Sequence, residues 1–140
     1  MFGDDRGQMR KVYIDAWRKH RQGSPAEPME MMVVETIAHH PEYHDLLADE
    51  EQALNKDFDP EAGESNPFLH MGMHLAIREQ VQTDRPAGIK AVYEQQLRKR
   101  QDPHPVEHAM MECLARMLWE AQGRGGVPDE QEYLECLRKL

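Results

Sequence analysis

Apolar residues recur every three or four positions along almost the whole chain, which is the spacing of amphipathic helices. In the first such segment the apolar positions are Met9, Val12, Tyr13, Ala16 and Trp17. No segment alternates apolar and polar residues in the way that a half-buried strand does. The predicted helices span approximately residues 9–20, 25–39, 41–48, 67–82, 86–97, 106–122 and 129–140. The sequence therefore predicts an all-α fold, a helical bundle of about six to seven helices.

Prolines and short polar residues mark the predicted helix ends. Pro25, Pro28, Pro41, Pro67 and Pro86 are each expected in a first helical turn, where the missing N–H costs nothing. Pro103 and Pro105 are expected to separate two helices. Asn66 is a suitable cap for the helix that Pro67 opens, and Asp129 with Glu132 resembles a capping box at the start of the last helix.

One segment interrupts the helical pattern. Residues 55–66 read N-K-D-F-D-P-E-A-G-E-S-N, which is acidic and rich in turn-forming residues, with Phe58 as its obvious apolar anchor. At 140 residues the chain has the length of one domain. We therefore expect a single helical domain over residues 1–140, with an irregular acidic loop near 55–66.

Composition and charge limit the classes of partner. The chain carries 26 acidic and 17 basic residues, a formal net charge of −9, which argues against nucleic acid as a partner because phosphates require clustered Lys and Arg. The first residues, M-F-G-D-D-R-G-Q, lack the pattern of a signal peptide, and no window is long and apolar enough for a membrane span. A cytoplasmic protein without a membrane partner is expected.

Cys113 and Cys136 have neither the number nor the spacing of a disulfide framework, so we expect reduced thiols.

The segment from Pro67 to Ile77 places two histidines in an otherwise apolar helix. His70 and His74 are four residues apart, so their imidazoles lie on one side of the helix, one turn from each other. Neutral imidazoles at this spacing are metal ligands in many proteins, whereas the zinc-protease pattern H-E-x-x-H is absent because Met71 occupies the Glu position. The alternative is that each is a core histidine hydrogen-bonded to a carbonyl or carboxylate.

Glu30 is a carboxylate on an apolar helix face, which it shares with Val33, Val34 and Ile37. A lone carboxylate in such a position needs a metal, a cation or several hydrogen-bond donors. The alternative for Glu30 is that it caps free amides at the start of its own helix.

His104, His108, Glu112 and Trp119 form a row beside the apolar stripe of one predicted helix. His108 and Glu112 project together one turn apart, as metal sites in helical bundles require. The alternative is an exposed pair worth about 0.2–0.5 kcal/mol. Nearby Met111, Ala115 and Trp119 argue against full exposure.

Three motifs indicate a family. The motifs are H-P-E-Y-H at His40 to His44, N-P-F-L-H-M-G-M-H-L-A-I at Asn66 to Ile77, and H-A-M-M-E-C-L at His108 to Leu114. Through these long segments the chain resembles a bacterial family catalogued as domain of unknown function 1841. The resemblance spans almost the whole chain and implies no particular activity.

The interpretation that these features favour is a buried His/Glu site that binds a transition-metal ion, Zn, Fe or Mn, with a role in hydrolysis or redox chemistry. The expected ligands are His74 and His108 first, then Glu112, His44, His70 and Glu30. A metal-bound water of lowered pKa would then be the reactive group. The competing interpretation is a noncatalytic interaction module whose His and Glu side chains form a structural polar network. Whether the chain self-associates or binds another protein stays open.

Overall fold

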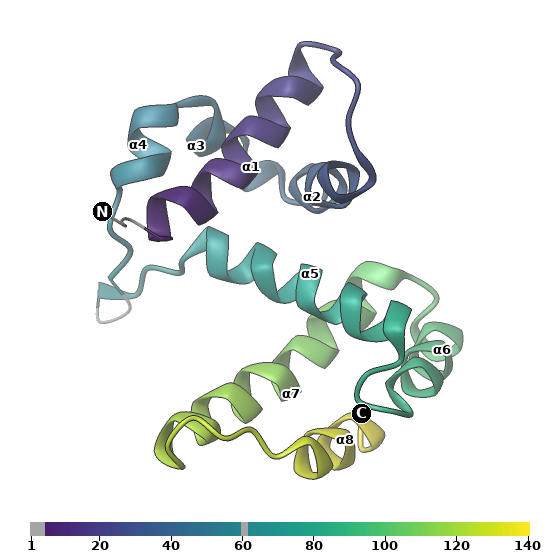
Figure 1. The fold of residues 1–140 in the computed structure, drawn as a ribbon. Helices are drawn as coiled ribbons and strands as arrows, with labels where there is room; N and C mark the ends of the chain where they lie inside the picture. The colour runs from purple at the N-terminus through teal and green to yellow at the C-terminus, as the bar shows by residue number, and fades with distance from the viewer. Residues whose placement is uncertain (1–4, 60–61) are drawn as a thin grey trace. The chain divides into compact units, whose positions relative to one another are not determined.

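All regular secondary structure in residues 5–59 and 62–140, which the computed structural model describes, is helical (Figure 1). This confirms the all-α prediction, although these residues form eight α-helices rather than six or seven. The helices are α1 (Asp5–Arg21), α2 (Pro28–Ala38), α3 (His44–Ala48), α4 (Glu50–Asn55), α5 (Pro67–Thr83), α6 (Ile89–Arg100), α7 (Pro103–Gly123) and α8 (Glu130–Arg138), with a 3₁₀ turn η1 (Pro41–Tyr43) before α3. Residues 60 and 61 of the predicted acidic loop lie outside the described residues, and the described part of 56–66 contains no α-helix.

Side-chain caps account for several of the observed helix starts. Asn66 Oδ1 accepts hydrogen bonds from the amides of Phe68 (2.9 Å) and Leu69 (3.3 Å), as the sequence predicted. The Asp129 carboxylate accepts from two amides of α8, also at the predicted place. Asp49 caps α4 in the same way, and this short helix was not predicted from the hydrophobic pattern.

Three predicted boundaries were wrong. Pro25 lies before the helix that it was expected to open, since α2 begins at Pro28. Pro86 does not open a helix, because it lies in a turn in which Asp84 Oδ1 accepts from the amides of Gly88 and Lys90, both at 3.0 Å, and α6 begins at Ile89. Pro103 lies inside the first turn of α7 instead of before it, since Asp102 caps that turn and prolines there lose no helical hydrogen bond. His104 is therefore a helical residue.

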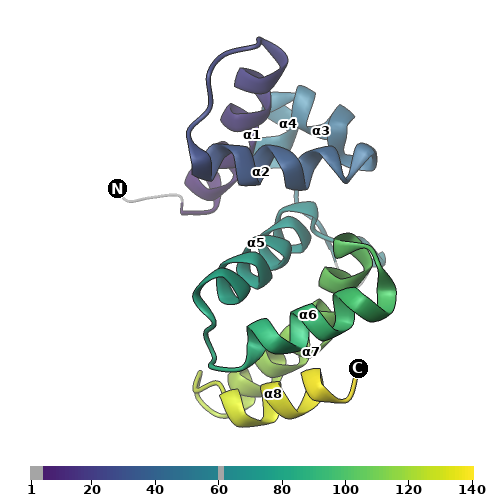
Figure 2. The same cartoon turned by 90° about the vertical axis from the view of Figure 1, so that its right-hand side faces the viewer.

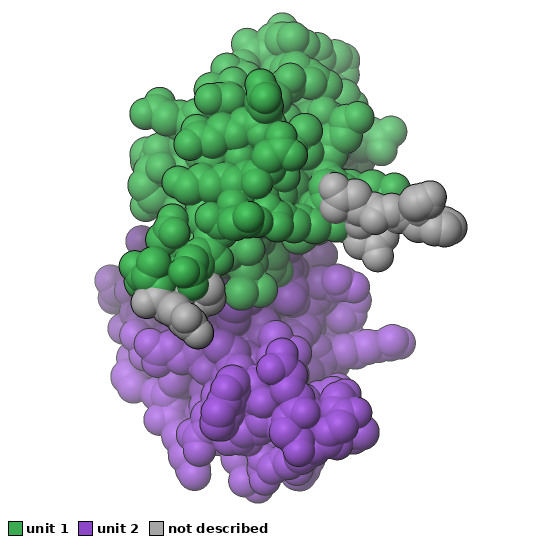
Figure 3. Space-filling model, turned by 90° about the vertical axis from the view of Figure 1, so that its left-hand side faces the viewer, with its two compact units in different colours: residues 1–72 green, residues 73–140 purple. Residues whose placement is uncertain are grey.

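The chain divides into two compact units, residues 1–72 and 73–140 (Figure 3). The division falls within α5, between Gly72 and Met73. The single-domain organisation stays a prediction, and each unit is described by itself.

In the first unit α1 is the central element and packs against α2, α3 and α4. Its core includes Ile14, Trp17, Ile37, Leu47 and Phe68, all buried. Two positions that belong to the apolar pattern of the first helix are instead exposed, Met9 and Val12.

A buried arginine links α1 to the end of α4. Arg10 is 2 % exposed, and its Nη1 donates to the carbonyls of Ala53 (3.1 Å) and Lys56 (2.8 Å). Its guanidinium carbon also lies 4.9 Å from the centroid of the Phe68 ring. The charge of Arg10 thus satisfies terminal carbonyls of a helix of six residues, which is too short to be stable by itself.

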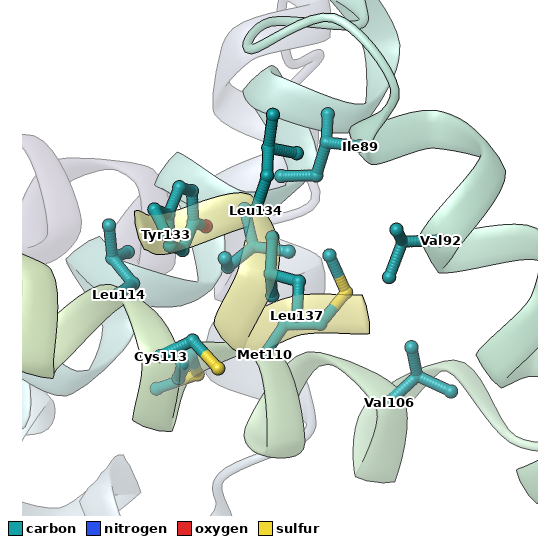
Figure 4. Packing of buried hydrophobic residues seen from close by; sticks show 11 residues of the cluster. Ile89, Val92, Val106, Met110, Cys113, Leu114, Tyr133, Leu134 and Leu137 are labelled. Carbon is teal, nitrogen blue, oxygen red and sulfur yellow. The ribbon is translucent and has the colours of Figure 1, made fainter. Parts of the chain in front are cut away.

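In the second unit α6, α7 and α8 pack on one another around one apolar cluster (Figure 2). Figure 4 shows this core, to which α8 contributes Tyr133, Leu134 and Leu137, α7 contributes Val106, Met110, Cys113 and Leu114, and α6 contributes Ile89 and Val92. Ile77 of α5 is also fully buried in the cluster.

Cys113 and Cys136 form a disulfide that joins α7 to α8, with their Cα atoms 5.8 Å apart. The prediction of reduced thiols was therefore wrong. Packing of α7 on α8 brings together two cysteines that are 23 residues apart in the sequence. No local sequence pattern predicts this pairing.

Among the described residues, no helix combines the length and apolar character that a bilayer crossing requires.

Candidate metal centre

Three imidazoles of the second unit lie together. His74 comes from α5, and His104 and His108 come from successive turns of α7. The ring centroids are 5.0 Å apart for His74 and His104, 4.7 Å for His74 and His108, and 4.2 Å for His104 and His108. One ring nitrogen of each lies within 4.8 Å of the others. We call His74, His104 and His108 the histidine cluster.

This separation is close to what a bound ion requires. A tetrahedral zinc ion at about 2.0–2.1 Å from each nitrogen holds two nitrogens about 3.3 Å apart. Closing from 4.8 Å or less to that value requires each ring to move by less than about 1 Å, which small changes of side-chain torsion provide. The three side chains therefore have the donor type of a metal site and could hold an ion after this movement.

A buried carboxylate orients one member of the histidine cluster. The Nδ1 atom of His74 is 2.8 Å from Oε1 of Glu107, and the two side chains are 1 % and 4 % exposed. An ionised carboxylate only accepts hydrogen bonds, so Nδ1 is the donor in this pair and Nε2 is the nitrogen that would bind an ion. Carboxylates play this role behind metal-binding histidines, where they fix the tautomer and increase the basicity of the ligand.

An arginine in turn holds the carboxylate. Arg78, one turn after His74 on α5, donates from Nε to Oε2 of Glu107 at 3.1 Å. Burial by itself would raise the pKa of Glu107, but the hydrogen bond from His74 and the charge of Arg78 outweigh it and hold the pKa below its ordinary value of 4.5. Glu107 is therefore ionised at neutral pH and available to both donors.

Local sequence explains how these side chains reach the interior. Glu107, Met110, Met111 and Leu114 are spaced as one face of a helix, and all are buried. His104 and His108 are half-buried beside this face. On α5, His74 and Ile77 point to the interior of the second unit, and each is at most 1 % exposed.

His74 and His108, the first two ligands expected from the sequence, are thus brought together. Glu112 does not join them, because it lies on the exposed face of α7. Of the flanking residues that argued against exposure of the pair, Met111 is buried, whereas Ala115 and Trp119 are exposed, Trp119 at 74 %. The argument is confirmed for His108, which is half-buried, and was wrong for Glu112.

The other expected ligands belong to the first unit and have contacts there. Glu30 forms the capping box with Glu27 that was its structural alternative, and it accepts from Nζ of Lys19 at 2.8 Å. The hydrogen bond from Lys19 is the main cause that lowers the pKa of Glu30. His44 donates from Nε2 to the carbonyl of Ile37 at 2.8 Å, and its ring packs on Trp17 with the centroids 4.6 Å apart.

His70 pairs with His40, which was not among the ligands expected from the sequence. His40 is 4 % exposed, and its Nδ1 donates to the carbonyl of Thr36 at 2.7 Å. Nε2 of His40 then accepts from Nε2 of His70 at 3.1 Å. This pair lies in the first unit.

Sequence reasoning missed Glu107 and Arg78 and did not include His104 among the expected ligands. A signal for Glu107 existed, since it occupies the apolar stripe of α7 at helical spacing from Met110, Met111 and Leu114. Arg78 has no comparable signal. His104 was recognised as part of the row with His108 and Glu112 but was not included as a ligand, and Pro103 and Pro105 were interpreted as a break rather than as part of the first turn of α7.

Comparison with known proteins identifies the family to which the chain belongs. No curated protein and no solved structure is significantly similar to this chain. The sequence model of one family matches residues 5–139, almost the entire length. The chain therefore belongs to the family described as domain of unknown function 1841 (DUF1841).

Proposed function

We propose that this protein binds one transition-metal ion in its second unit through the imidazoles of His74, His104 and His108. The observation that carries the proposal is the convergence of three imidazoles, of which His74 is oriented by the buried carboxylate of Glu107. Buried carboxylates are costly, and this one has the position and partners of a residue that supports a ligand.

The donor set bears on the identity of the ion. Imidazole nitrogen suits Zn²⁺ and Fe²⁺ better than Mn²⁺, which prefers carboxylate oxygen. Glu107 is engaged by His74 and Arg78, and Glu112 is exposed. Among the three metals expected from the sequence, we therefore favour zinc or iron over manganese. Such an ion lowers the pKa of a bound water, the basis of a hydrolytic role, and iron would permit a redox role.

The test is the metal content of untagged protein purified without chelators. We expect about one equivalent of Zn or Fe in the parent, and at least a tenfold weaker affinity in His104→Ala and in His108→Ala. Both side chains are half-buried, so these substitutions disturb the core less than a change at His74. His20→Ala is the matched control, since His20 is exposed at the end of α1.

The alternative function, a noncatalytic interaction module, rests on the same side chains. His74, Glu107 and Arg78 already form a hydrogen-bonded network that holds α5 against α7. In that case the purified protein contains no metal and takes up neither Zn²⁺ nor Co²⁺. The histidine variants then lose stability only, and this outcome would refute the metal proposal.

Location and partners complete the proposal. We propose a cytoplasmic protein that does not bind nucleic acid, in keeping with the net charge of −9. Size-exclusion chromatography with light scattering measures whether the chain self-associates.

A further inference from the structure

The disulfide of the second unit lies at a pocket. Cys113 and Cys136 both line a cavity of about 490 Å³ formed by α7, α8 and the turn between them. Small-molecule sites in proteins have about 300–1,000 Å³, so a molecule of tripeptide size fits. The cavity is lined by charges of both signs, including Arg116, Lys139 and Glu135.

The two sulfur atoms of the disulfide are not equivalent. Cys113 is 2 % exposed and belongs to the apolar cluster, next to Leu114. Cys136 is only partly buried and packs against the outside of that cluster. An attacking thiolate must reach one of the two sulfur atoms, and Cys136 is the more accessible of the two cysteines.

We propose that the Cys113–Cys136 disulfide is a thiol-exchange site, attacked at Cys136 by a small zwitterionic thiol that enters the pocket. The pocket supplies access, and its mixed charges suit a molecule with both carboxylates and an ammonium group. This inference is independent of the proposed metal site.

The exchange has two balanced steps. A thiolate attacks Sγ of Cys136, a mixed disulfide forms, the Cys113–Cys136 bond breaks, and Cys113 leaves as a thiolate that then takes a proton. A second thiolate attacks the sulfur of the small molecule in the mixed disulfide and releases Cys136 as a thiolate, which also takes a proton. Two small thiols are thereby oxidised to one disulfide, and the protein disulfide gains two electrons.

Reduction of the disulfide is expected to increase local opening of α8 first. The bond closes a loop that spans 23 residues, and removing such a closure increases the equilibrium for local opening on the order of 300-fold. The last helix is held otherwise by Tyr133, Leu134 and Leu137, and by a hydrogen bond from Tyr133 to Gln80 at 2.7 Å. We expect α8 to open more often after reduction while α7 retains its contacts with α6.

The experiment uses the unmutated protein and reduced glutathione as the probe. After a short reaction, free thiols are alkylated and peptides are mapped by mass spectrometry. The expected result is glutathione on Cys136 and the alkyl group on Cys113. Glutathione on Cys113, or reduction no faster than global unfolding, would overturn the proposal.

Single-cysteine variants and hydrogen exchange provide the matched comparison. Cys113→Ser leaves Cys136 alone and should react with oxidised glutathione at least tenfold faster than Cys136→Ser, in which the buried Cys113 remains. Amide exchange in α8 should accelerate on the order of 300-fold in the reduced protein. The double variant, Cys113→Ser with Cys136→Ser, should exchange at that faster rate with or without glutathione. Equal reactivity of the two single variants, or unchanged exchange in α8, would contradict the inference.

Discussion

Replacement of Arg78 by Met tests the electrostatic support of the histidine cluster. Met retains much of the apolar stem but removes the guanidinium that donates to Oε2 of Glu107 at 3.1 Å. The carboxylate of Glu107 remains buried with the hydrogen bond from His74. Removing one partner of a buried ion pair costs about 3–5 kcal/mol. Because the side chain of Arg78 is 18 % exposed and water can partly replace it, we expect a loss near the lower end, about 3 kcal/mol.

The assay is urea denaturation followed by circular dichroism at neutral pH. The matched control is Arg116→Met, which removes an exposed ion pair with Glu120 in which the arginine side chain is 71 % exposed. We expect that control to change the free energy of unfolding by less than about 0.5 kcal/mol. If Arg78→Met costs no more than Arg116→Met, Glu107 does not depend on Arg78 and the reasoning is refuted.

The pH dependence gives a second check on the same pair. The pKa of Glu107 is lower in the folded protein than its ordinary value of 4.5, so Glu107 stabilises the fold above that value. This contribution is lost as the pH falls through the lowered pKa of the folded state. Arg78→Met removes one cause of the lowering, so the difference in stability between parent and variant should shrink as the pH falls below about 4.5. A difference that stays constant across this range would contradict the assignment.

Three further predictions concern other parts of the chain. Arg10→Met should lower the free energy of unfolding by about 2–3 kcal/mol in urea denaturation, because carbonyls at the end of α4 lose a charged donor; a neutral effect would show that water replaces it. Glu30→Gln and Glu112→Gln should leave the metal content measured by elemental analysis unchanged, since Glu30 is paired with Lys19 and Glu112 is exposed. Trp119→Ser should change stability by less than about 0.5 kcal/mol, because the ring is 74 % exposed, and a larger loss of unfolding free energy would mean that the ring is packed.

Much of the local structure was predictable because its causes are local. Helical spacing identified the all-α class, and the caps at Asn66 and Asp129 operate as their residue types suggest. The short helix α4 was missed because its apolar pattern covers too few residues for periodicity to be visible. Pro103 was misjudged because proline both ends a helix and fits its first turn, and the cap at Asp102 decides between the two.

The candidate site was predictable only in part, since its contacts are tertiary. His74 stood out as a polar residue in an apolar helix, whereas Glu30, equally conspicuous, proved to be a capping residue. Glu107 was overlooked although it occupies a buried stripe, because its partners, His74 and Arg78, lie on α5 and cannot be identified from the sequence around it. The disulfide depends on how α7 meets α8, which no spacing along the chain encodes.

The first turn of α7 has a consequence for the order in which ligands assemble. His104 stands between two prolines, whose rings restrict backbone torsions before the chain folds, and Asp102 anchors that turn. In the proposed metal site, α7 would therefore supply two of the three imidazoles, His104 and His108, from successive turns of one helix. Only the third, His74, would depend on the packing of α5 against α7.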